Sequence, residues 1–174
     1  MHSLVVGGTG ILRPAAQTLA ERGWRVTVLA RGATDEPPQQ FAAAVDVRDT
    51  PALAAALDGA ISARGPFDLA LVYAPTAPAA SMEAIAGHVE GRLIYVLTSE
   101  WSAPEADRAR REAWAPDGAG NLTQRVTLGW TYGAEGVRWH TPEEVGRATL
   151  DALEHRASET TLGTLRPWSN RPSA

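Results

Sequence analysis

The chain has 174 residues, of which 44% are hydrophobic and 21% are charged, and its formal net charge is −4. These values are typical of one globular domain, and the acidic balance gives no electrostatic reason to expect nucleic acid or an anionic membrane as a partner. There is no cysteine, so disulfides, thiolate nucleophiles and cysteine-bound metals are excluded. All 16 basic residues are arginine, so a mechanism that needs a lysine ammonium is excluded as well.

No apolar run approaches the ~20 residues of a membrane span, and the chain opens with a strand pattern rather than a signal peptide. The four histidines are scattered without the spacing of metal ligands, so no metal site is expected. The sequence therefore predicts a cytoplasmic protein in which residues 1–174 form a single domain, with residues 160–174 as a tail.

A glycine-rich turn follows the first predicted strand. The apolar run Leu4-Val5-Val6 leads directly into Gly7-Gly8-Thr9-Gly10, and a helical pattern then runs from Ile11 to Arg22. A glycine turn between a strand and a helix is typical of dinucleotide binding, because its backbone admits a phosphate and the helix N–H groups face the anion. The expected cofactor contacts in this stretch are Gly7, Thr9, Gly10, Ile11 and Leu12.

The turn departs from the usual motif at Arg13, which stands where a third glycine normally allows close packing of helix on strand. We expect Arg13 to point outward, towards the cofactor phosphate. The alternative for the whole motif is an ordinary tight turn in an α/β protein.

Arg31 follows the second predicted strand, Arg25 to Ala30. An Asp or Glu at this place would accept hydrogen bonds from the ribose 2′-OH of NAD, whereas an Arg favours the 2′-phosphate of NADP. The sequence therefore indicates NADP rather than NAD. The alternative is that Arg31 is a solvated loop charge.

A short third strand, residues 41–45, ends at Asp46 and Val47. Asp46 is placed to accept a hydrogen bond from an adenine amino group and Val47 to lie against the ring, although Asp46 would also suit a solvent-facing turn. The next helix is predicted to begin with Thr50 as its N-cap and to end at Gly59.

Strands and helices continue to alternate along the rest of the chain. Strands are predicted at 67–73, 92–97 and 122–128, with a possible short seventh at 161–165. Helices are predicted at 78–89, at 104–114 and behind a capping box that begins at Thr141. The alternation in 122–128 is typical of an edge strand or of one wet face, and residues 129–133 are expected to form the loop that leaves it.

This order predicts an α/β fold with a doubly wound parallel sheet, the Rossmann fold, in which the strands lie in the order 3-2-1-4-5-6. A ligand of such a sheet binds at the carboxyl ends of the strands. Ala74 and Pro75, directly after the fourth strand, are therefore added to the expected cofactor contacts.

These motifs resemble the short-chain dehydrogenase/reductase superfamily, and within it the small atypical NAD(P)-binding proteins. The resemblance extends from about residue 3 to residue 156. The resemblance rests on the glycine turn at 7–12, the strand end at 29–31, the stretch 45–49 and Thr98-Ser99. It implies an NADP cofactor, or less readily NAD, and a small-molecule substrate that the sequence does not identify.

In that superfamily a Tyr and a Lys four residues later transfer the proton, helped by a Ser at the end of the fifth strand. Ser99 matches this serine, but no tyrosine can have the lysine partner because the chain has no Lys. The resemblance therefore implies an atypical proton donor, for which the candidates are Tyr73, Tyr132 and Ser99. A phenol serves only if its pKa of about 10 is pulled towards neutrality.

Two functions remain open from the sequence. The first is an NADP-dependent oxidoreductase with an atypical proton donor. The second is a dinucleotide-binding protein without turnover, such as a redox sensor or a subunit of a complex. Tryptophans late in the chain, among them Trp139 and Trp168, suit a partner surface, and a homodimer is expected.

Overall fold

The computed structural model describes the chain except for residues 34–39, 106, 119, 121, 135 and 174. In this part of the chain, the main sheet has seven strands, and every neighbouring pair is parallel. Its strands are β1 (His2–Val6), β2 (Arg25–Ala30), β3 (Gln40–Ala44), β4 (Phe67–Val72), β5 (Val89–Leu97), β6 (Leu122–Leu128) and β9 (Glu159–Leu162).

The strand order is β3-β2-β1-β4-β5-β6-β9, which confirms the predicted order and adds the short seventh strand beside β6. That strand begins two residues earlier than expected, at Glu159. The inner strands β1 and β4 are mostly buried because both of their faces are covered. All five residues of β1 are buried, as are five of the six in β4.

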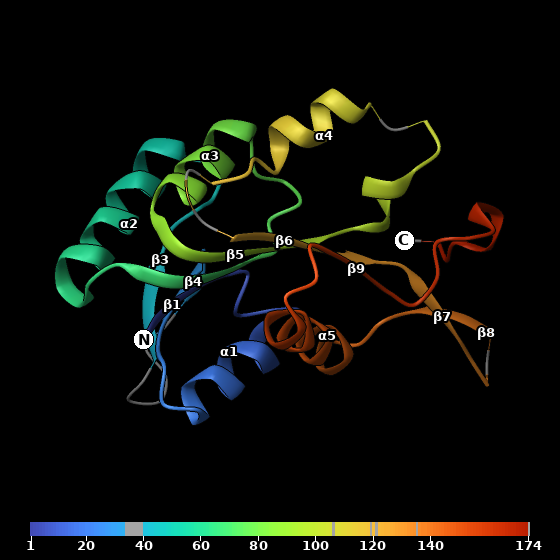
Figure 1. Cartoon of the computed structure of the whole chain (residues 1–174), viewed down its shortest axis with the longest axis horizontal. Coiled ribbons are helices and arrows are strands. Elements are labelled where there is room, and N and C mark those ends of the chain that lie inside the picture. The colour runs from blue at the N-terminus through green and yellow to red at the C-terminus, as the bar shows by residue number, and fades with distance from the viewer. Residues whose placement is uncertain (34–39, 106, 119, 121, 135, 174) are drawn as a thin grey trace.

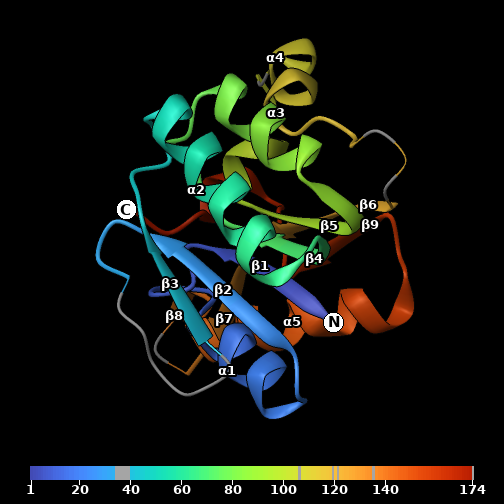
Figure 2. The same cartoon turned by 90° about the vertical axis from the view of Figure 1, so that its left-hand side faces the viewer.

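Helices cover both faces of the sheet, as Figure 1 shows with the sheet seen edge-on. On one face lie α1 (Arg13–Glu21) and α5 (Pro142–His155), and on the other lie α2 (Thr50–Arg64), α3 (Ala79–Gly87) and α4 (Arg108–Trp114). Figure 2, seen from the β3 edge, shows the same three layers. Each face has its own apolar core, with Leu19 and Leu71 in one and Leu57 and Met82 in the other. No described helix has the length and apolar character needed to cross a membrane.

The second helix differs from the prediction at both ends. Its N-cap is Asp49 rather than Thr50, because the Asp49 carboxylate accepts a hydrogen bond from the backbone N–H of Ala52 at 3.0 Å. The helix also continues through Gly59 to Arg64. An exposed glycine costs a helix only about 1 kcal/mol, and the buried Ala60 that follows it packs against the core.

Two predictions about the region after β5 are wrong. β6 is not an edge strand, because β9 pairs with it in parallel. Of residues 129–133, which were expected to form a loop, Trp130–Gly133 form the strand β7, which pairs antiparallel with β8 (Gly136–Trp139) in a hairpin. The hairpin extends beyond the end of the main sheet in Figure 1. The capping box at the start of α5 is confirmed: the Thr141 hydroxyl accepts from the Glu144 N–H, and Glu144 accepts from the Thr141 N–H.

Candidate functional site

A groove of about 770 Å³ runs along the carboxyl ends of β1, β2, β3 and β4. It brings together most of the residues that the sequence analysis assigned to a cofactor. Those that line it are Gly7, Thr9, Gly10, Ile11, Arg31, Asp46, Val47, Ala74 and Pro75, and Tyr73 lines it as well. Leu12 does not line it, since its side chain is fully buried in the core. Arg13 is exposed at the start of α1 and also lies outside the lining.

The glycine turn is shaped by contacts that leave no room for a side chain at its first position and little room at its second. Gly7 has a φ of +85°, and a Cβ there would lie 2.6 Å from the carbonyl oxygen of Tyr73. At Gly8, a Cβ would lie 3.0 Å from a Val28 methyl and 3.1 Å from a Val5 methyl. Gly8 therefore allows the turn to lie close to the sheet.

Gly10 differs from both, because the nearest atom to a Cβ there would be 3.8 Å away. The fold does not need a glycine at this position, although the groove is lined by it. A glycine that the fold does not require leaves open space for a ligand to approach the backbone.

Backbone donors lie in the turn that borders this space. The N–H of Gly10 donates to the Gly7 carbonyl at 3.1 Å, and that of Arg13 donates to the Gly10 carbonyl at 3.0 Å. Among the described residues, the N–H groups of Ile11 and Leu12 have no acceptor. Such free donors at the start of a helix bind anions, and the helix dipole adds to the attraction.

Three charged side chains stand at the end of the groove formed by β2 and β3. Arg31 is exposed after β2, while Asp46 and Arg48 follow β3. The Arg48 guanidinium donates to both carboxylate oxygens of Asp46, at 2.6 to 3.1 Å, and its backbone N–H donates at 3.0 Å. These hydrogen bonds lower the pKa of Asp46 to about 2, so the carboxylate is ionised at neutral pH.

Arg48 is a groove residue that the sequence reasoning missed. Its position two residues after Asp46 was the available signal, because a turn residue and its second neighbour are often joined by a side-chain hydrogen bond. The contact means that Asp46 already has one donor, and that two arginines line the same end of the groove.

A second cavity, the inner pocket, has a volume of about 290 Å³ and adjoins the groove. Ile11 and Tyr73 line both cavities. The other lining residues are Thr98, Ser99, Leu128, Gly129, Trp139, His140, Val145 and Arg171. The pocket is therefore built from the ends of β5, β6 and β8, the starts of two helices and a residue close to the C-terminus.

The three predicted proton donors are placed differently. Ser99 is buried in the inner pocket, and its Oγ accepts a hydrogen bond from Arg171 Nε at 3.0 Å. Tyr73 lies half-buried between the two cavities, and burial raises the pKa of its phenol. Tyr132 does not line the pocket: it is 57% exposed on β7, and its hydroxyl accepts from Asn170 Nδ2 at 3.0 Å.

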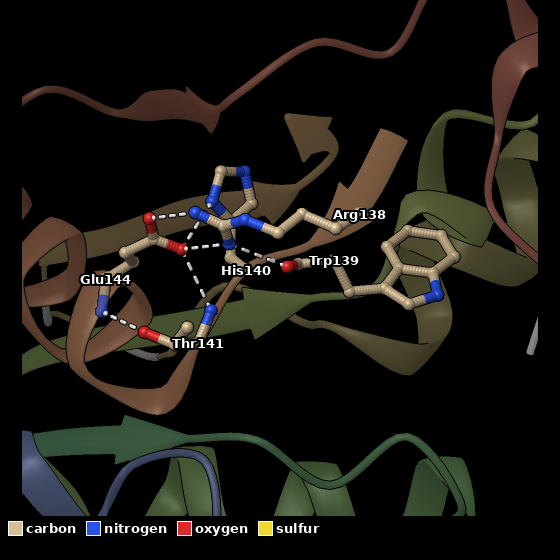
Figure 3. A network of polar contacts seen from close by, with 5 residues as sticks. All are labelled: Arg138, Trp139, His140, Thr141 and Glu144. Atoms are coloured by element: carbon tan, nitrogen blue, oxygen red, sulfur yellow. Dashed lines mark hydrogen bonds and ion pairs between the residues drawn. The ribbon is translucent and has the colours of Figure 1, made fainter. Parts of the chain in front are cut away.

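A network of polar contacts fixes the wall of the inner pocket where β8 joins α5 (Figure 3). The Arg138 guanidinium donates to both carboxylate oxygens of Glu144 at 2.8 Å. These bonds, with the one from the Thr141 N–H, lower the pKa of Glu144 well below its usual range. His140 lies 3.3 Å from the same carboxylate through Nδ1, while its buried Nε2 has no partner among the described residues.

His140 and Arg171 both line the inner pocket, and neither had a role predicted from the sequence. His140 precedes Glu144 by four residues at the recognised capping box, and this spacing was the usable signal. No local signal marks Arg171, because it is 72 residues from its partner Ser99. Within the described ranges, no group of three or more His, Asp or Glu side chains could hold a metal ion.

Comparisons with known proteins find likeness in structure only. No family model matches the sequence, and no curated protein matches it. A short-chain dehydrogenase from Streptomyces avermitilis superposes with a TM-score of 0.71 at 15% identity, covering 93% of this chain and 87% of that one. A short-chain dehydrogenase/reductase from Serratia marcescens gives 0.66 at 16% identity, covering 93% and 95%.

A metagenomic short-chain oxidoreductase, solved in complex with NADP, gives a TM-score of 0.61 at 18% identity, covering 94% of this chain and 97% of that one.

The strand order, the flanking helices and the glycine turn at the carboxyl end of β1 define a Rossmann-like α/β protein. More particularly, the chain has the fold of the short-chain dehydrogenase/reductases.

Proposed function

We propose that this chain is a member of the short-chain dehydrogenase/reductase superfamily that binds NADP(H) in the groove and acts as an oxidoreductase on a small molecule. The observation that carries the proposal is the groove itself. It joins a glycine turn, free backbone N–H groups directly before α1 and two arginines along the carboxyl ends of four parallel strands. Open α/β sheets bind their ligands at this edge.

The residues present fit such a cofactor. The open space at Gly10 and the N–H groups of Ile11 and Leu12 would hold the pyrophosphate. Asp46 and Val47 would hold the adenine, and Ala74 and Pro75 would bound the path towards the inner pocket. When bound, the nicotinamide supplies or accepts a hydride, and the protein has to orient the substrate and exchange a proton with it.

The preference for NADP over NAD rests on charge. Arg31 lines the groove at the end of β2, where an acidic residue would instead favour the 2′-OH of NAD. Arg48 lies at the same end, but Asp46 neutralises it. Arg31 is therefore the cation that we assign to the 2′-phosphate, and Arg13, exposed outside the groove lining, is a less direct candidate.

For the proton we propose Tyr73 and Ser99, because both line the inner pocket and Tyr132 does not. The Tyr73 phenol is protonated at neutral pH, but burial raises its pKa instead of lowering it towards neutrality, so its proton is harder to release than the sequence analysis required. Ser99 Oγ already accepts from Arg171, so its own O–H is free to donate to a substrate oxygen.

The second candidate function is dinucleotide binding without turnover, as in a sensor or a subunit of a complex. The observation that favours it is the surroundings of Tyr73. Burial raises the pKa of this phenol, and the chain has no lysine to lower it. Substrate screening separates the two functions, since only the oxidoreductase oxidises NADPH when a small carbonyl compound is added.

The proposal also covers the location and assembly of the protein: a cytoplasmic domain formed by residues 1–174, associated as a homodimer. The described strands of the main sheet run from residue 2 to residue 162, which supports one domain. Light scattering after size exclusion tests the dimer, and a monomer mass at micromolar concentration contradicts it.

Calorimetric titration with NADPH, NADP⁺, NADH and NAD⁺ in parallel tests the cofactor, after a check for bound cofactor in the purified protein. We expect binding with a clear preference for the phosphorylated pair. Gly10→Val should abolish it, because the added side chain fills open groove space without a clash in the fold. Gly59→Val is the matched control, since Gly59 is equally open but lies on α2 away from the groove. Failure of all four dinucleotides to bind the wild type refutes the proposal.

If an activity is found, Tyr73→Phe and Ser99→Ala should each lower kcat about 100-fold, the size typical of a lost proton-transfer group. Tyr132→Phe is the matched comparison, because its hydroxyl lies outside the inner pocket. If Tyr73→Phe and Ser99→Ala both keep the wild-type kcat, neither residue is the proton donor.

A further inference from the structure

The C-terminal segment of residues 163–173, here named the strap, passes directly over the end of β6. Two glycines permit the crossing. A Cβ at Gly129 would collide with the backbone of Thr164, and one at Gly163 would collide with His140 and the Trp130 carbonyl. Gly163 also has a φ of +77°, which favours glycine. The strap therefore lies as close to the sheet end as backbone allows.

Contacts along its length hold the strap in place. Thr164 and Trp130 exchange two backbone hydrogen bonds of 2.9 Å. The Trp168 ring packs edge-on against the buried Trp130, with centroids 5.9 Å apart, and Trp139 Nε1 donates to the Ser173 carbonyl at 3.3 Å. A segment anchored at several points presents its side chains in a fixed geometry, which lowers the entropy cost of binding.

The strap brings Arg171 into the inner pocket. Its guanidinium lies over two indole rings, 5.4 Å from the centroid of Trp139 and 5.3 Å from that of Trp168. Nε donates to Ser99 Oγ at 3.0 Å, and Nη2 forms an ion pair with Glu100 at 2.5 Å. Stacking on aromatic rings orients the plane of the guanidinium.

Arg171 has further N–H groups that could donate to a ligand. A guanidinium has five N–H groups, and the two contacts above leave several of them without an acceptor in the described part of the chain. Ser99 is left with a hydroxyl proton to donate. The rest of the pocket is mainly apolar, with Ile11, Leu128 and Val145 among its walls. Arg171 and Ser99 thus offer hydrogen-bond donors in a small cavity that also has apolar walls.

We propose that the inner pocket binds a small carboxylate compound, and that Arg171 determines this specificity by pairing with the carboxylate group. This inference rests on the proposed function, because it names the substrate class of that site. A guanidinium pairs with a carboxylate through two parallel hydrogen bonds, which fixes orientation as well as affinity. The apolar walls would then hold a short hydrocarbon body.

A carboxylate fits the charges better than a phosphate does. Arg171 carries a single positive charge that one carboxylate neutralises, whereas the second negative charge of a phosphate would meet no second arginine among the described lining residues and would be repelled by Glu100. The Glu100 side chain is 60% exposed, so it can turn to solvent when a ligand carboxylate takes its place. Glu100 therefore acts as the internal competitor of the substrate.

Binding of two compounds that differ mainly in the carboxylate tests the proposal. The probes are 4-methyl-2-oxopentanoate and the neutral 4-methyl-2-pentanone, titrated into the protein with saturating NADP⁺ and also without it. Tryptophan fluorescence provides the readout, because the Trp139 and Trp168 rings lie close to Arg171. We expect the oxo acid to bind the wild type at least tenfold more tightly than the ketone.

Arg171→Leu should weaken binding of the oxo acid about 10- to 100-fold, which is the range for a lost charged hydrogen bond. Binding of the ketone should be unchanged. Arg166→Leu is the matched control. Arg166 is also on the strap and stacks on Trp168, but it does not line the pocket. Glu100→Gln should strengthen oxo-acid binding several-fold, since it removes the competing charge.

The outcomes separate this inference from the proposed function. Equal binding of the two probes to the wild type, or an Arg171→Leu variant that binds the oxo acid normally, overturns the carboxylate assignment even if NADP⁺ binds. If inorganic phosphate displaces the oxo acid more strongly than acetate does, the pocket is a phosphate site and the assignment is wrong. If none of the four dinucleotides binds while the oxo acid does, the proposed function fails and the carboxylate site stands.

Discussion

The groove and the inner pocket are neighbours that share Ile11 and Tyr73, yet they are assembled in different ways. All residues that line the groove fall between Val6 and Thr76, and they follow four strands in regular succession. The inner pocket joins Ile11 to Arg171, and its contact between Ser99 and Arg171 spans 72 residues. The proposed cofactor site is thus encoded locally, whereas the proposed substrate site depends on distant parts of the chain meeting.

The largest effect on stability is expected in the groove, whose lining residues are close in sequence. Gly7→Val should destabilise the protein by ~3 kcal/mol or more, because it combines a φ of +85° with a side chain that meets the Tyr73 carbonyl. Urea denaturation measures the loss. Gly10→Val, three residues along, should unfold at nearly the wild-type midpoint. If both variants were equally stable, the turn would not have the geometry described above.

The corresponding change for the inner pocket is Gly163→Ala. The methyl group would meet His140 and the Trp130 carbonyl at a positive φ, so the strap should detach at a cost of ~1–3 kcal/mol. We expect binding of the oxo acid to be lost and NADP⁺ binding to be retained, which calorimetry with each ligand would measure. Parallel loss of both affinities would show that the two cavities are not independent. Gly136→Ala is the control, since that glycine also has a positive φ but lies at the tip of the hairpin, with nothing near its Cβ.

Arg31→Asp addresses the selectivity of the groove. The variant loses the proposed partner of the 2′-phosphate and gains a repulsive charge, so NADPH should bind about 10- to 100-fold more weakly while NADH changes little. Parallel titrations give the ratio. Arg22→Asp is the control, because Arg22 pairs with Glu154 on the surface and does not line the groove. An equal loss for the two dinucleotides would argue against Arg31 as the selectivity residue.

The smallest effect concerns the wall of the inner pocket. Glu144→Gln removes the charge that pairs with Arg138, and we expect it to cost ~1 kcal/mol of stability at pH 7. The folded-state pKa of Glu144 is depressed, so its contribution is present above the unfolded pKa of about 4.3 and is lost as the pH falls through the folded value. Denaturation at pH 7, 4 and 2.5 should show the wild type and the variant converging in acid. If the difference in unfolding free energy between wild type and variant is the same at all three pH values, the charge of Glu144 is not the cause of that difference.

The sequence predicted the sheet well because its signals are local. Buried parallel strands read as apolar runs, and the glycine turn and the capping box at Thr141 each lie within a few residues. Strand order was correct through β6, and β2 and β6 have the predicted limits. Within the groove, Arg48 was missed because a side-chain contact with Asp46 is not fixed by strand pattern alone.

The region after β6 was predicted poorly for a physical reason. The alternation in β6 suggested an edge, but β9 covers it, and nothing in 122–128 specifies a partner more than thirty residues away. Tyr132 was expected at the carboxyl end of a strand, and the unforeseen hairpin carries it outward to an exposed position. Ser99 was placed at the right strand end, but its partner Arg171 lies in what was expected to be a tail.

The 72-residue separation of Ser99 and Arg171 also sets an order of assembly during synthesis. The segments that line the groove are complete once residue 76 has left the ribosome, whereas the inner pocket must wait for Arg171. Closing so long a loop is slow compared with forming adjacent βαβ units. The nascent chain therefore has every segment that lines the groove well before the inner pocket can form, and the strap is the last part of the proposed site to be made.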